Sequence, residues 1–267
     1  MTATATTYDL WAKAPEARPN GLRQWWSLTE RILRVMVKGE LPIAIITPLI
    51  FTLGFYLPLR YVMRFQGIDY AQFVMPIIVL NTMAFTMNST AQRAAFDAMT
   101  GMSDRLHTMP IARLAPLGSR ITSGFIRSVI SLAAAIGFGY IIGFRFVAGF
   151  WQAALFLGFA LAVGTVLSLG ADALGTLTRK PEALSQALTL PTLIFGMLSS
   201  GFVPETGFPE WIRPFVRNQP ISQFSLSMRD MADHGVSFHV LWPSLAWLIG
   251  GALVFTPLAV WVSERRK

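Results

Sequence analysis

Two ionisable residues, Arg127 and Asp172, lie within long apolar stretches of the chain, where a charge is costly. An unpaired charge at the centre of a bilayer costs about 2.5–3.5 kcal/mol on insertion scales. We therefore predict that Arg127 and Asp172 form an ion pair that fixes two helices at the same height and serves structure. In the alternative, Arg127 is a cation that reaches the headgroups, and Asp172 lines a path through the membrane.

Residue patterns that support catalysis are absent from this sequence. There is no Cys, no H-E-x-x-H pair and no G-x-S-x-G motif, and the only histidines are His107, His234 and His239. No lysine follows a Gly, so the chain lacks the G-K-[ST] phosphate-binding loop. We therefore expect no catalytic site, metal site or cofactor in this chain. Any ATP hydrolysis would require a separate subunit.

The second apolar stretch carries several amide and hydroxyl side chains among Met and Phe residues. Amides and hydroxyls can line a path or form hydrogen bonds between helices, and Met side chains suit irregular hydrophobic ligands. Plain packing of the Met side chains is the alternative. The candidate path residues are Met75, Asn81, Phe85, Asn88, Phe195 and Met197.

Six long stretches without a formal charge must position these residues. They are Leu41–Leu59, Tyr70–Gln92, Ser128–Phe144, Phe146–Ala171, Ala183–Pro204 and Val240–Ser263. A helix of about 20 residues crosses the hydrocarbon core of a bilayer. The composition agrees, since 53% of the residues are hydrophobic and only 13% are charged. We predict an all-α membrane protein with six transmembrane helices.

The basic residues predict the orientation. With the N-terminus in the cytoplasm, fifteen of the 22 Lys and Arg residues fall on the cytoplasmic side and six on the outer side, with Arg127 inside a span. Positive charge is enriched in cytoplasmic loops, so we expect a multi-pass protein of the cytoplasmic (inner) membrane with both termini in the cytoplasm. These loops account for the net charge of +8, and no nucleic-acid partner is expected.

The segment Leu22–Glu40 has the pattern of an amphipathic helix. Its cations gather on one arc, and apolar side chains cover the rest. Such a helix lies in the membrane interface, although a cytosolic helix packed on a partner is the alternative. The residues expected at headgroup level and near anionic lipid are Trp25, Trp26, Arg31 and Arg34. Residues 1–21 would form a flexible cytoplasmic tail, and residues 22–267 one membrane domain.

Two further segments are predicted to form short helices outside the spans. Within the loop Arg93–Leu117, a helix over Asp97–Met109 would lie across the cytoplasmic face with exposed Met and Phe side chains, unless the segment is an ordinary loop. In Glu205–His239, prolines break the run, and apolar residues from Ile221 to Met231 have helical spacing. We expect short interfacial or re-entrant helices there, because irregular backbone at membrane depth must be buried in protein or line a wet cavity.

The order of these elements resembles the membrane subunit of type-2 ABC exporters, in particular the daunorubicin-resistance permease group. Three local matches carry the resemblance, which covers about residues 20–267. The matches are G-M-S-D-R-L-H-T-M-P-I-A-R at 101–113, A-L-G-T-L-T-R-K-P-E-A-L-S-Q-A-L at 173–188, and S-S-G-F-V-P-E-T-G-F-P-E-W-I-R-P-F-V-R-N-Q-P at 199–220. They are similar to the coupling segment, the basic link between spans 4 and 5, and the outer signature of these permeases.

The resemblance implies a permease that works with two nucleotide-binding ATPase subunits and a second permease, either a copy or a relative. ATP and Mg²⁺ would bind to the ATPase. ATPase movement would push the coupling segment and the interfacial helix, and open a path formed by spans 1, 2 and 5 to a hydrophobic drug, polyketide or lipid. The implied coupling residues are Phe96, Asp97, Met99, Gly101, Met102, Asp104 and Arg105.

Three other functions compete with this interpretation. A polysaccharide-chain exporter permease shares the fold but needs a wet channel with aromatic side chains that stack on sugars. A non-transporting membrane assembly protein needs no path. An intramembrane enzyme is disfavoured by the missing catalytic motifs. An ATPase with a phosphate-binding loop that copurifies with this chain would discriminate export from the last two.

Overall fold

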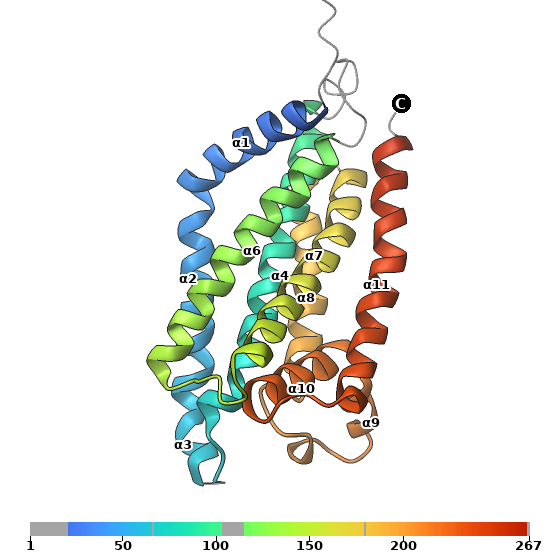
Figure 1. The fold of residues 1–267 in the computed structure, drawn as a ribbon. Coiled ribbons are helices and arrows are strands. Elements are labelled where there is room, and N and C mark those ends of the chain that lie inside the picture. Colours follow the sequence, from blue (N-terminus) through green and yellow to red (C-terminus); the bar gives the residue numbers. More distant parts are fainter. Residues whose placement is uncertain (1–20, 66, 103–114, 179, 266–267) are drawn as a thin grey trace, which may run out of the picture.

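In a computed structural model, the chain is a bundle of long helices with short helices at one end (Figure 1). The structure describes residues 21–65, 67–102, 115–178 and 180–265. These residues contain no β-strand. The first described helix and the end of the last helix lie at the same end of the bundle, which we call the α1 end (Figure 1). The opposite end, where the short helices lie, is called the α10 end.

The described part of the chain contains twelve helical elements. The elements are α1 (Gly21–Gly39), α2 (Leu41–Phe51), the π-helical η1 (Thr52–Tyr56), α3 (Leu57–Phe65), α4 (Tyr70–Met99), α6 (Ala115–Ile142), α7 (Phe150–Leu177), α8 (Pro181–Met197), the 3₁₀-helical η2 (Glu205–Gly207), α9 (Arg213–Asn218), α10 (Pro220–Asp233) and α11 (Phe238–Arg265). The elements α2, η1 and α3 form one continuous spanning helix. Its Pro58 has no N–H to donate to the carbonyl four residues earlier, and the widened turns of η1 lie just before this proline.

Five helices of the described chain are long and apolar enough to cross a membrane, so the protein is a multi-pass membrane protein. They cover Leu41–Phe65, Tyr70–Met99, Ala115–Ile142, Phe150–Leu177 and Phe238–Ser263. The remaining predicted span, Ala183–Pro204, corresponds to α8, which has only 17 residues. It ends at Met197 because the chain turns in the Gly- and Pro-containing segment that follows.

Helix α4 is the centre of the bundle, and most of its membrane-length segment is buried. It packs against α6, α7, α8 and α10, and its apolar residues form most of the main core. The contact with α7 requires a glycine. A Cβ atom on Gly175 would lie 2.4 Å from the Ala91 carbonyl oxygen and 2.8 Å from the Ala94 Cβ atom. Small residues at such a crossing let two membrane helices approach closely.

The segment after α8 forms short helices, as its prolines and apolar spacing predict. Phe224, Met228 and Met231 point from α10 into the core and are buried. Arg229 joins α10 to its neighbours, because its guanidinium donates to the carbonyl oxygens of Phe73 and Ser200 and lies 3.6 Å from the centre of the Phe73 ring. Burial lowers the pKa of Arg229 to about 10, so the side chain remains charged at neutral pH.

Candidate functional site

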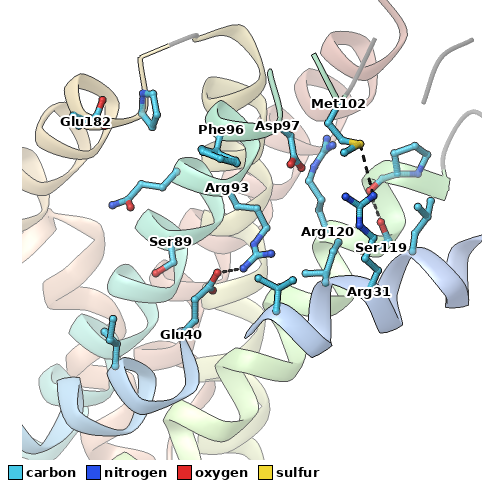
Figure 2. A pocket seen from close by; sticks show the side chains of 17 residues that line it. Arg31, Glu40, Ser89, Arg93, Phe96, Asp97, Met102, Ser119, Arg120 and Glu182 are labelled. Carbon is cyan, nitrogen blue, oxygen red and sulfur yellow. Dashed lines mark hydrogen bonds and ion pairs between the residues drawn. The ribbon is translucent and has the colours of Figure 1, made fainter. Parts of the chain in front are cut away.

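A cavity of about 590 Å³ opens at the α1 end of the bundle, between α1, α4 and α6 (Figure 2). Apolar side chains from α1 and α4 alternate in its wall with charged ones. We call it the charged cavity. It is lined by Leu28, Arg31, Ile32, Val35, Glu40, Ile43, Ser89, Gln92, Arg93, Phe96, Asp97, Met102, Pro116, Ser119, Arg120, Pro181 and Glu182.

Glu40 lies at the junction between α1 and α2 and holds three helices together. Its carboxylate accepts hydrogen bonds from Arg93 of α4 and from Arg127 of α6. Arg127 also donates to the Thr86 carbonyl oxygen at 3.2 Å and to the Thr90 hydroxyl at 3.1 Å, both on α4. One carboxylate is therefore shared by two guanidinium groups where α1 turns into the first span, and its charge balances one of their two positive charges. Figure 2 shows the contact between Glu40 and Arg93.

A second ion pair joins α6 to α7 behind the charged cavity. Arg120 binds Asp172 through two hydrogen bonds, Nε to Oδ1 at 2.6 Å and Nη2 to Oδ2 at 3.1 Å. Both side chains are buried. This two-pronged geometry is the strong form of an Arg–carboxylate contact.

The predicted pair between Arg127 and Asp172 is therefore wrong. Arg120 precedes Arg127 by two helical turns on α6, which is about 10 Å along the axis, and it is Arg120 that reaches Asp172. Arg127 meets Glu40 instead. The sequence offered one signal for this partner, since Glu40 is the only acidic residue between Glu30 and Asp69. It borders the first apolar stretch, but nothing in its spacing connects it to α4 or α6.

The end of α4 replaces the first part of the predicted separate helix over Asp97–Met109. Alanines and other helix-forming residues continue α4 through Met99, and the chain leaves the helix at Gly101, whose φ of +68° suits glycine. Phe96 and Met99 are 54% and 50% exposed on the last turn. Met102 meets α1, where the Arg31 Nη1 atom lies 3.7 Å from its sulfur.

Comparison with known proteins identifies the family. The family model of the ABC-2 family transporter proteins matches residues 63–261. The chain belongs to the ABC-2 transporter family. It is 37% identical over 259 residues to the "Doxorubicin resistance ABC transporter permease protein DrrB" of Mycobacterium tuberculosis, covering 91% of this chain and 90% of that protein. It is 26% identical over 238 residues to the "Probable doxorubicin resistance ABC transporter permease protein DrrC" of the same species, covering 87% and 85%. The predicted family is confirmed.

Those predicted coupling residues that the structure describes lie close together at the end of α4. Phe96, Asp97 and Met102 line the charged cavity, and Met99 is exposed beside them. Asp104 and Arg105 lie outside the described residues. Their role in binding an ATPase stays a prediction.

The segment predicted as Leu22–Glu40 forms α1 over Gly21–Gly39. Its two tryptophans face different surroundings. Trp25 lies against α6, close to Gly118, whereas Trp26 is exposed. Arg34 forms an exposed ion pair with Glu30 one turn away, and Arg31 lines the charged cavity. Contact with lipid headgroups stays a prediction for this helix.

The predicted path residues do not all come together. Asn81 and Phe195 line a second cavity, of about 570 Å³, between α4 and α8. We call it the aromatic cavity, because Phe195, Phe215, Phe224 and Trp247 line it. Asn88 donates to the Thr189 hydroxyl of α8 at 2.7 Å, which is a hydrogen bond between helices. The remaining three lie elsewhere: Met75 is buried in the core, Phe85 packs edge-on against Phe51, and Met197 is exposed.

No group of three or more His, Asp or Glu side chains that could hold a metal ion occurs in the described part of the chain. Five charged side chains near the α1 end instead form ion pairs with one another: Glu40 with Arg93 and Arg127, and Arg120 with Asp172. What this arrangement can do is mechanical, since the ion pairs connect the exposed end of α4 to α1, α6 and α7.

Proposed function

We propose that this ABC-2 protein is the membrane subunit of an ATP-driven exporter and that it works with a separate ATPase chain. One observation carries the coupling part of the proposal: exposed apolar residues at the end of α4 stand beside a charged cavity at the α1 end. Exposed apolar side chains that gather on one surface mark an interaction site, and Phe96 and Met99 lie together on the last turn of α4. The chain's lack of a phosphate-binding loop supports a separate ATPase.

The ion pairs give this contact a route into the bundle. A partner that pushes on Phe96, Met99 or α1 moves both Arg93 on α4 and the α1–α2 junction at Glu40, because Arg93 and Glu40 form an ion pair. Glu40 in turn holds Arg127 on α6, and Arg120 of α6 holds Asp172 on α7. Four elements would therefore shift together when the ATPase subunits close.

The proposed topology has six spans. Helix α8 is added to the five long helices and is the fifth span along the chain. It is shorter than the others because the segment 198–204 turns back before the membrane surface. Both termini then lie at the α1 end, in the cytoplasm, which agrees with the clustering of Lys and Arg. The short helices α9 and α10 would sit in the outer leaflet. Large apolar side chains exposed on α2 and α11 suit lipid and a second permease, either a copy or a relative.

The substrate class proposed is a hydrophobic drug, with polyketides and lipids as related possibilities. Two relatives are named for doxorubicin resistance, and one of them matches 91% of this chain. This part of the proposal can be tested in cells that lack their own drug exporters. Doxorubicin accumulation is measured with the chain alone, with a phosphate-loop ATPase from the same gene cluster alone, and with both.

We expect lower doxorubicin accumulation only when both chains are present. An ATPase with its phosphate-loop lysine replaced serves as the control and should restore full accumulation. Equal accumulation in all strains, with both proteins present in the membrane, would overturn the export function.

A further inference from the structure

A third cavity, of about 480 Å³, opens where the first spanning helix ends in α3 and the chain enters α4. Figure 1 places α3 at the α10 end, opposite to the charged cavity. We call it the arginine–tyrosine cavity, because its polar lining is mostly of these two residue types: Tyr56, Arg60, Tyr61, Arg64, Asp69 and Tyr70. None of its described lining residues belongs to the charged cavity or the aromatic cavity.

The two arginines of the cavity lie one turn apart on α3, so they share a face of the helix. The Arg60 guanidinium donates to the Tyr61 hydroxyl, and its central carbon lies 4.4 Å from the centre of the Tyr61 ring and 5.9 Å from that of Tyr56. These rings orient the guanidinium by cation–π contact and leave its other N–H groups without a partner among the described residues. The exposed Arg64 side chain forms no hydrogen bond or ion pair with the described residues.

Asp69 is the one acidic residue among the described residues of this cavity. Its side chain caps the start of α4, because it accepts a hydrogen bond from the Ala71 backbone nitrogen at 3.1 Å. It lies within ion-pair distance of neither arginine, since the described residues contain no such pair. Two guanidinium groups and one carboxylate leave the cavity with a net charge of one positive unit.

The four other arginines at the α10 end are occupied by the chain itself. Three donate to backbone carbonyl oxygens and one pairs with a carboxylate: Arg145, Arg213 and Arg229 form the first group, and Arg217 the second. At this end, the described residues leave only Arg60 and Arg64 without a carbonyl or carboxylate partner. Guanidinium groups arranged in this way suit an anion from outside the chain.

Apolar side chains beside the two arginines indicate which anion. Leu57, Val62 and Phe65 are exposed on the other faces of α3, at the end of a membrane-spanning helix. A basic head next to exposed apolar side chains and tyrosine rings is the chemistry of the membrane–water interface. A free phosphate ion would use only the arginines, whereas a phospholipid would use both surfaces.

We propose that the arginine–tyrosine cavity binds the headgroup of an anionic phospholipid, such as phosphatidylglycerol, from the leaflet at the α10 end. The phosphodiester oxygens would accept hydrogen bonds from Arg60 and Arg64, and the Tyr61 hydroxyl, whose oxygen already accepts from Arg60, would donate its own proton to them. The acyl chains would lie along Leu57, Val62 and Phe65. The ammonium group of phosphatidylethanolamine would add a third cation here. The inference goes beyond the proposed export function and does not depend on it.

The test measures phospholipid binding to the purified, delipidated chain by native mass spectrometry. Phosphatidylglycerol and phosphatidylethanolamine with the same acyl chains are titrated separately, and the unchanged chain should bind phosphatidylglycerol more tightly. Each basic side chain near a membrane surface strengthens attraction to anionic lipid about fivefold. We therefore expect Arg60→Gln/Arg64→Gln to weaken phosphatidylglycerol binding about tenfold or more. Since neither arginine forms an ion pair with the described residues, this variant should melt like the unchanged chain.

Arg213→Gln/Arg217→Gln is the matched control. It removes two arginines with the same spacing at the same end of the bundle, but the chain's own oxygens occupy these two. This variant should keep its affinity for phosphatidylglycerol. Tyr61→Phe keeps the ring that contacts Arg60 and removes the hydroxyl, so it should weaken binding less than the double substitution of Arg60 and Arg64.

Three outcomes would overturn the proposal. Equal losses in the two double variants would mean that phosphatidylglycerol responds to net charge alone. Equal affinity of the unchanged chain for the two lipids would contradict selection by the arginines. Displacement of phosphatidylglycerol by an equal concentration of glycerophosphoglycerol, the headgroup without acyl chains, would assign the cavity to a soluble phosphate compound. The assay contains no ATPase and no drug, so each result is independent of export.

Discussion

The charged cavity and the aromatic cavity are similar in volume and opposite in chemistry. The first contains three Arg and three acidic side chains, and three of these six form ion pairs. The second contains no charged side chain, and its polar groups are three amides, one hydroxyl and the indole N–H of Trp247. Ion pairs fix the relative positions of helices and transmit a push, whereas neutral acceptors in an apolar wall can bind an uncharged group without a large cost of desolvation. We infer that the α1 end transmits force and the α10 end holds the ligand.

The largest expected effect of a single substitution falls on the buried pair behind the charged cavity. Asp172→Ala leaves Arg120 buried without its partner, and we expect a loss of about 3–5 kcal/mol in the free energy of unfolding. The measurement is thermal stability and yield of folded protein in detergent. The double variant Arg120→Met/Asp172→Leu should lose less than the single variant. A larger loss in the double variant than in Asp172→Ala would mean that the two side chains are not coupled.

The next effect concerns the junction of α1 and α2. Glu40→Gln removes the charge shared by Arg93 and Arg127, and we expect a loss of about 1.5–3 kcal/mol. The loss is smaller than for Asp172 because Glu40 is partly exposed and Arg127 keeps Thr86 and Thr90. Glu30→Gln is the matched control on α1, where the pair with Arg34 is exposed and contributes less than about 1 kcal/mol. Similar losses for both variants would contradict a special role of Glu40.

The third prediction tests whether the α1 end is the ATPase contact. Phe96→Asp places a charge on an exposed apolar residue, and we expect it to weaken association with the ATPase about tenfold, or about 1.4 kcal/mol. Phe65→Asp is the control, since Phe65 is 92% exposed at the α10 end. Copurification of the ATPase with each variant is compared by quantitative blotting. Undiminished copurification with Phe96→Asp would move the contact away from the end of α4.

The smallest effect is expected at the α10 end of the bundle. Arg217 pairs with Glu205 at 2.8 Å, but the Arg side chain is largely exposed to solvent. Arg217→Ala should therefore leave the thermal stability of the protein nearly unchanged. A melting curve measured beside that of Asp172→Ala gives the comparison. A large loss would show that charge pairs at the α10 end also hold the bundle together.

The sequence predicted the long helices well because an uncharged run must be helical to cross a membrane. It also predicted the short helices near Pro214 and Pro220, where proline begins a new helix. The helix that contains the second uncharged stretch continues beyond Gln92, since Arg93 and Asp97 interrupt the apolar run without interrupting the helix. Charge patterns mark lipid exposure, and helix propensity continues past them.

Pairings between helices could not be predicted from the same patterns. Arg120 and Arg127 lie two turns apart on α6, and only the relative height of α6 and α7 decides which of them meets Asp172. Gln219 was not among the predicted site residues, although it lies in the N-Q-P run that resembles the permease signature. Its amide nitrogen lies within hydrogen-bonding distance of three acceptors, two carbonyl oxygens of the segment around Phe195 and the Ser222 hydroxyl, which spacing alone does not show.

Drug-stimulated ATP hydrolysis tests most directly whether the two cavities divide the work as inferred. The complex of this chain with its ATPase is placed in nanodiscs, and hydrolysis is measured with increasing doxorubicin. Ala84 lines the aromatic cavity, and Ala84→Phe fills it, whereas Ala246 is exposed on α11 and does not line the cavity. Doxorubicin should stimulate hydrolysis by the unchanged complex and by the Ala246→Phe complex. Stimulation of the Ala84→Phe complex should need about tenfold more drug or be lost. Identical stimulation curves for the unchanged complex and the Ala84→Phe complex would contradict the account, because doxorubicin would then stimulate the ATPase without occupying the aromatic cavity.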